Sequence, residues 1–135
     1  MPYEELPHTA DIRVRVWAGS MEGLFAEAAV AMNRIMYAPC QGEGVSESVS
    51  LNAEDIEALL HDFLSEVLFL SEVRGVVFCS AEVRIEGGSL NAILRGEPFD
   101  RRRHGCGPEI KGISYYGLRI YKRDEDYVME AIFDI

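Results

Sequence analysis

Two stretches of the chain carry apolar residues at helical spacing, while the stretches between them alternate apolar and polar positions. The first helical stretch is 20–37, and Ser20 is a suitable residue to cap its N-terminus. The second is 53–73, which has a broad apolar face and is the strongest element of the pattern. Asn52 is expected to cap it, because Asp55 follows three residues later in an arrangement close to a capping box. Both stretches therefore predict amphipathic helices.

Alternating positions predict the strands. Residues 12–16 place Ile, Val and Val on one face and Arg on the other, and 45–51 alternate in the same way. Residues 75–97 and 109–135 each predict a β-hairpin, and the Gly- and Pro-containing stretch 99–108 predicts a loop between them. The resulting order is β-α-β-α-ββ-ββ. It predicts an α+β fold in which the two helices pack on one face of a mixed or antiparallel sheet.

Length and composition narrow the class of protein. A chain of 135 residues, 48% apolar and 27% charged, is typical of one soluble globular domain spanning 1–135. No apolar run approaches the ~20 residues of a membrane span. The first residues, "MPYEELP", are acidic and lack the apolar core of a signal peptide, so we expect a cytoplasmic location.

The three cysteines are Cys40, Cys79 and Cys106. Their odd number and wide spacing argue against a disulfide framework, and the absence of a C-x-x-C pair argues against a zinc knuckle. We therefore expect reduced thiols with no special role.

The net charge of −10 is unevenly distributed. Residues 95–123 carry eight basic and three acidic side chains, and the rest of the chain is acidic. Such a balance disfavours general nucleic-acid binding, which depends on neutralising phosphates. It would suit a basic protein partner or contact with RNA at one place, although a solvated surface explains most of these charges equally well.

The end of the chain carries a candidate metal site. Asp134 is the penultimate residue, and Ile135 adds a main-chain carboxylate. If the last strand pairs antiparallel with the first, Asp11 faces Asp134 and the terminus. Clustered carboxylates favour a hard cation such as Ca²⁺ or Mg²⁺. The alternative is that Asp134 is simply solvated and Asp11 is a turn residue bonded to nearby amides.

Other polar residues leave alternatives open. His8 and His104 are candidate ligands or acid–base groups, or structural residues. Arg101–Arg103 could grip a phosphate or form a solvated loop. Lys111 could point toward the acidic end of the chain or into solvent, and His61 is expected at the surface. The chain contains no Gly-rich phosphate loop, nucleophile elbow or H-E-x-x-H motif.

Six segments, in order, resemble those of the archease family. They are "HTAD", "LFAEAAVAM", "DFLSEVLFL", "GEPFDRRRH", "EIKGISYYGL" and the terminal "FDI", and together they span nearly the whole chain. Two positions depart from the family pattern. Phe63 stands where Trp is usual, which is a conservative core change, and Tyr116 stands where His is common, so no role of that His is carried over to this chain.

The resemblance implies a function that composition does not. Archeases are protein cofactors of the RtcB-type RNA ligase, a manganese-dependent enzyme that joins RNA ends in tRNA splicing through a guanylylated histidine. They promote guanylylation and multiple turnover but are not enzymes themselves. The family's metal site, described with calcium, matches Asp11, Asp134 and the terminal carboxylate of Ile135, and its functionally important lysine matches Lys111. The resemblance implies at most indirect or transient RNA contact and no membrane association.

Two alternatives from other functional classes remain. One is a small metal-dependent phosphoester hydrolase that uses Asp11, Asp134, His8 and His104, although no positioned base or nucleophile is evident. The other is an RNA-binding module that uses Arg101–Arg103, which the acidic net charge disfavours.

Overall fold

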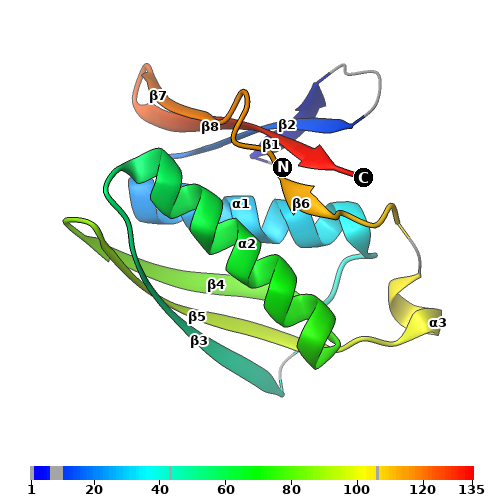
Figure 1. Cartoon of the computed structure of the whole chain (residues 1–135). Helices are drawn as coiled ribbons and strands as arrows, with labels where there is room; N and C mark the ends of the chain where they lie inside the picture. Colours follow the sequence, from blue (N-terminus) through cyan, green and yellow to red (C-terminus); the bar gives the residue numbers. More distant parts are fainter. Residues whose placement is uncertain (1, 7–10, 43, 106) are drawn as a thin grey trace.

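The computed structural model describes residues 2–6, 11–42, 44–105 and 107–135, which form eight strands and three helices (Figure 1). The strands are β1 (Tyr3–Leu6), β2 (Ile12–Ala18), β3 (Val45–Asn52), β4 (Val76–Glu86), β5 (Ser89–Pro98), β6 (Gly112–Ile113), β7 (Arg119–Arg123) and β8 (Asp126–Asp134). The helices are α1 (Met21–Met36), α2 (Ile56–Arg74) and the single turn α3 (Arg101–His104).

The strands divide into two antiparallel sheets. One sheet has the order β1-β2-β8-β6, with β7 also paired to β8, and the other has the order β3-β5-β4. Helices α1 and α2 lie between the two sheets and contact strands of both (Figure 1). The described part of the fold is thus a layer of helices enclosed by a sheet on either side.

The α+β class and the antiparallel pairing are confirmed, but the structure has two sheets where the sequence predicted one sheet with both helices on a single face. The pairing of β2 with β8 joins the two ends of the chain in one sheet, and the hairpin of β4 and β5 pairs with β3 in the other. Each helix accordingly buries residues toward two sides, as the nine buried residues of α1 illustrate.

Local sequence explains where the helices begin and end. The Ser20 side chain accepts a hydrogen bond from the Gly23 backbone N–H at 3.0 Å, which confirms the predicted cap. Asp55, rather than the predicted Asn52, caps α2 by accepting from Ala58 N–H at 2.7 Å. Gly75 ends α2 in the left-handed conformation, with φ of 63°, which a glycine adopts at low cost.

The core lies between the layers and is rich in aromatic and aliphatic side chains. Phe25 of α1, Phe63 of α2 and Phe133 of β8 are fully buried, and the first two rings are 5.9 Å apart. Phe63 is therefore a core residue, as its place in the sequence pattern predicted. None of the helices in the described part of the chain has the length and apolar character required to cross a membrane.

Two further features differ from the sequence predictions. The stretch 109–122 contains two short strands, β6 and β7, separated by a turn rather than one continuous strand. Cys40 and Cys79 form a disulfide, with Cα atoms 5.6 Å apart, so these cysteines are not the inert thiols expected from spacing. Sequence spacing could not reveal this pair, because a separation of 39 residues says nothing about distance in the fold.

Candidate functional site

The register of β2 and β8 brings the predicted acidic residues to one end of the sheet. The strands pair antiparallel, with Ile12 opposite Phe133, so Asp11 and Asp134 are the next positions outward on the two strands. We call the end of the sheet formed by Asp11, Lys111, Asp134 and Ile135 the carboxylate corner. Backbone pairing between β2 and β8 positions these residues, and this pairing does not depend on the carboxylate side chains.

Strand β6 completes the carboxylate corner on the other side of β8. Gly112 pairs with Asp134, and the Lys111 backbone N–H donates to the Asp134 carbonyl oxygen at 2.7 Å. The only candidate lysine of the sequence prediction therefore neighbours Asp134 through the main chain. A Cβ added to Gly112 would lie 3.8 Å from the Asp134 carboxylate, so this side chain lies over the Gly112 backbone.

The groups at the carboxylate corner are accessible to solvent. Asp134 and Lys111 are exposed, Asp11 is half-buried, and Ile135 is 46% exposed. Carboxylate oxygens are the donors that hard divalent cations prefer, and water can fill the remaining coordination positions. The donor set thus fits a calcium ion in kind. His8, the accessory residue expected beside Asp11, lies outside the described residues.

The structure places His104 in a different environment, in α3 and apart from the end of β8 (Figure 1). Its ring is 1% exposed and stacks near Phe99, with ring centroids 5.8 Å apart. Neighbouring Arg103 forms an ion pair with buried Glu97 at 2.6 Å. At least this arginine of the basic tract is therefore engaged within the fold.

One residue near the carboxylate corner was not proposed as a site residue from the sequence. His61 of α2 was expected at the surface, but its side chain is 17% exposed and Nε2 donates to the Ile113 carbonyl oxygen at 2.8 Å. Its ring stacks on Tyr115 at 3.7 Å, and Tyr116 next to it is 83% exposed. His61 thus fixes α2 to β6, the strand that carries Lys111 at its edge. Helical spacing alone gave no signal of this contact.

The outer face of the same sheet holds a charged cluster around Glu130 of β8. This side chain is 2% exposed and is contacted by Arg13 and Arg15 from β2 and by Arg119 and Tyr121 from β7. Burial raises the pKa of Glu130, but hydrogen bonds from Tyr121, Arg119 and Arg15 outweigh it and lower the pKa to about 2. The cluster joins the three strands and is explained as a structural ion-pair network.

Comparison with known proteins places the chain in a family. Residues 3–135 match the Archease protein family (MTH1598/TM1083). The chain is 36% identical to "Protein archease" of Methanopyrus kandleri over 141 residues, covering 100% of both chains. It is 34% identical to "Protein archease" of Pyrococcus abyssi over 139 residues, covering 98% of each.

Solved structures share the fold. The solution structure of Methanobacterium thermoautotrophicum protein 1598 superposes with a TM-score of 0.81 at 23% identity, covering 99% of both chains. A crystal structure from Thermotoga maritima, described as "an archease, possible chaperone", superposes with a TM-score of 0.68 at 21% identity, covering 98% of this chain and 96% of that one.

Proposed function

The chain belongs to the archease family, and from this premise we propose that it is a non-enzymatic protein cofactor of an RtcB-type RNA ligase in tRNA splicing. In this role it would promote guanylylation of the ligase and multiple turnover. The observation that carries the proposal is the match to the family over residues 3–135. The description of the Thermotoga relative as a possible chaperone agrees with action on a partner protein.

The carboxylate corner is the proposed active surface. Asp11, Asp134 and the carboxylate of Ile135 would hold a divalent cation, for which we propose Ca²⁺. The bound ion would offset the repulsion between the carboxylates and present a positive centre to the partner. The adjacency of Lys111 and Asp134 along the β6–β8 pairing supports a single surface that includes the lysine.

An activator works by interacting more favourably with one state of its partner than with another. The carboxylate corner is exposed at the end of a sheet, where it could approach the active site of the ligase. The residues of this chain would then favour the ligase conformation that accepts the nucleotide. No ligation chemistry is assigned to this chain, and contact with RNA would be indirect or transient.

The two alternative functions have less support. A hydrolase that combines Asp11 and Asp134 with His104 would need an accessible histidine, whereas His104 is buried against Glu97 and Phe99. An RNA-binding module based on Arg101–Arg103 would act with Arg103 already paired to Glu97, and the net charge of −10 disfavours general binding of RNA.

The test is a guanylylation and multiple-turnover assay with the RtcB-type ligase of the same host. We expect the wild-type protein to raise both rates, and Asp11→Asn, Asp134→Asn and Lys111→Ala to abolish this effect. Glu125→Gln, in the turn that precedes β8, and Lys122→Ala, the other lysine of the chain, are matched controls and should activate fully. Full activation by all three corner variants, or RNA ligation or phosphoester hydrolysis by the protein alone, would contradict the proposal.

Calcium binding is tested separately by thermal melting with and without Ca²⁺. A ligand stabilises the folded state only as far as it binds it, so Ca²⁺ should raise the melting temperature of the wild type and have a smaller effect on Asp11→Asn. An extension beyond Ile135 should also reduce the calcium effect, because it converts the terminal carboxylate into a neutral amide. An unchanged shift in both variants would rule out these ligands.

A further inference from the structure

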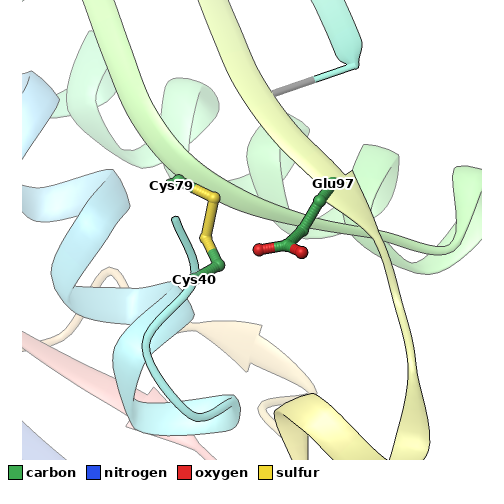
Figure 2. Close-up of side chains that lie close together, drawn as sticks. All are labelled: Cys40, Cys79 and Glu97. Atoms are coloured by element: carbon green, nitrogen blue, oxygen red, sulfur yellow. A yellow bond between two sulfur atoms is a disulfide. The ribbon is translucent and has the colours of Figure 1, made fainter. Parts of the chain in front are cut away.

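Three potential metal ligands from distant parts of the sequence meet beside α1. They are Cys40 in the connection from α1 to β3, Cys79 of β4 and Glu97 of β5, and their ligand atoms all lie within 4.8 Å of one another (Figure 2). This group of side chains, which we call the sulfur–carboxylate cluster, is separate from the carboxylate corner. In the structure the two sulfurs are joined in a disulfide.

The surrounding backbone directs the two cysteines toward each other. The register of β4 against β5 shifts between Phe78 and Ser80, so Cys79 occupies an irregularity in the ladder. Such a bulge changes the direction of a side chain. The side-chain carbonyl of Asn33 in α1 accepts the Phe78 N–H at 3.0 Å, which fixes this irregularity against the helix.

Glu97 is a buried carboxylate that backbone hydrogen bonds hold in place. It is 4% exposed, and its Oε1 accepts the backbone N–H groups of Gln41 and Gly42, each at 3.1 Å. A Cβ at Gly42 would collide with the Glu97 side chain, so only glycine leaves room for it there. Burial raises the pKa of Glu97, but the bond from Gln41 and the charge of Arg103 lower it below its ordinary value.

His104 provides an independent sign that Glu97 serves a ligand. Its Nδ1 accepts the Asp100 backbone N–H at 2.8 Å, so the proton of the neutral ring is on Nε2. This buried Nε2 has no hydrogen-bond partner within the described structure and points at Glu97 Oε1, 3.6 Å away. Carboxylates that bind metals are commonly held by such outer groups, and a small movement of Glu97 would complete the bond.

We propose that Cys40, Cys79 and Glu97 bind a zinc ion when the two cysteines are reduced, and that the disulfide is the oxidised form of the same site. Two thiolates and one carboxylate are ligands that Zn²⁺ commonly takes, with water in the fourth position. Bond lengths of about 2.0–2.3 Å place tetrahedral ligands roughly 3.5–3.8 Å apart. The observed cluster, within 4.8 Å, therefore needs only side-chain adjustments once the sulfur–sulfur bond is broken.

The exchange between the two forms balances with a low-molecular-weight disulfide as the oxidant. The two zinc-bound thiolates lose two electrons and form the Cys40–Cys79 bond, while the oxidant gains the two electrons and leaves as two thiolates. The Zn²⁺ ion is released without a change of oxidation state. Reduction by a dithiol reverses the sulfur chemistry and restores the zinc ligands.

The experiment uses the full chain, reduced with a phosphine, stripped of metal with a chelator and confirmed by thiol titration. Co²⁺ is titrated as a spectroscopic probe and then displaced by Zn²⁺. We expect the reduced protein to bind one equivalent of Co²⁺ that shows tetrahedral and thiolate-to-metal absorption bands. The oxidised protein should show neither band, and oxidised glutathione should release one zinc from the zinc-loaded protein. Cobalt held only by the oxygen ligands of the carboxylate corner would lack the thiolate-to-metal bands, so these bands report on the sulfur–carboxylate cluster alone.

Variants identify the ligands. Cys40→Ser and Cys79→Ser should each weaken cobalt binding and reduce the thiolate-to-metal band, and the double variant should remove the band altogether. Glu97→Gln should weaken binding at least about tenfold. Cys106→Ser is the matched control and should bind normally, and circular dichroism checks that every variant is folded. The proposal is overturned if the reduced wild type binds no more cobalt than the Cys40→Ser/Cys79→Ser double variant. It is equally overturned if Cys106→Ser abolishes the spectrum, if Glu97→Gln binds normally, or if the disulfide of the folded protein cannot be reduced.

Discussion

Replacing Glu130 by Gln should make the stability of this protein much less dependent on acid pH. The Glu130 carboxylate receives hydrogen bonds from Tyr121 at 2.7 Å, Arg119 at 3.1 Å and Arg15 at 3.2 Å. These contacts lower its pKa from 4.5 to about 2. The folded protein thus holds Glu130 ionised at pH values where the unfolded chain binds a proton.

The size and the sign of the effect follow from proton linkage. A difference between 4.5 and about 2, at ~1.4 kcal/mol per pH unit, corresponds to about 3–4 kcal/mol. Because the pKa is lowered on folding, this contribution is fully present above the unfolded pKa of 4.5 and is lost as the pH falls toward 2. Other carboxylates titrate in the same range, but they cancel in the difference between the wild type and Glu130→Gln.

The assay is urea denaturation of the wild type and Glu130→Gln between about pH 7 and about pH 3. We expect the stability difference to be largest at neutral pH and to shrink steadily below about pH 4.5. The matched control is Glu4→Gln, which removes a half-exposed carboxylate that contacts only Arg15 of the same cluster, and it should cost less than about 1 kcal/mol. A difference for Glu130→Gln that stays constant across the pH range would refute the linkage argument.

Three further changes probe the fold itself. Phe63→Ala removes a fully buried ring from α2 and should cost about 3–5 kcal/mol in urea denaturation. Asp55→Ala removes the N-cap of the same helix and should cost about 1 kcal/mol, again in urea denaturation. Gly96→Ala places a Cβ against the Val77 carbonyl oxygen between β4 and β5, so its melting temperature should fall well below that of Ala92→Gly on the same strand, which creates no clash.

Helices and hairpins could be predicted because their signals are local. The apolar spacing of 20–37 and 53–73 requires only neighbouring residues, and both helices are present. The division into two sheets could not be predicted, because alternation shows that a stretch is a strand but not which strand it pairs with. The capping of α2 by Asp55 rather than Asn52 has a similar origin, since both residues are good caps and the helix start decides between them.

The two candidate sites also differ in how far the sequence could predict them. The approach of Asp11 to Asp134 follows from one assumption, the pairing of the first and last main strands, and the observed register is consistent with it. The meeting of Cys40, Cys79 and Glu97 depends on a connection, a bulge and two strands at once. No spacing rule combines these features, so cysteine counting pointed to inert thiols instead.

The burial and bonding of each site also determine which variants report on function. The carboxylate corner is built on backbone pairing, and its side chains are exposed or half-buried, so Asn replacements should leave the fold unchanged and report on binding alone. Glu97 receives two backbone N–H groups and pairs with Arg103 while nearly fully buried, so its replacement disturbs the fold as well as any bound ion. Loss of activation in Asp134→Asn can therefore be assigned to the carboxylate, whereas loss of metal in Glu97→Gln needs the cysteine variants beside it before it can be assigned to a ligand.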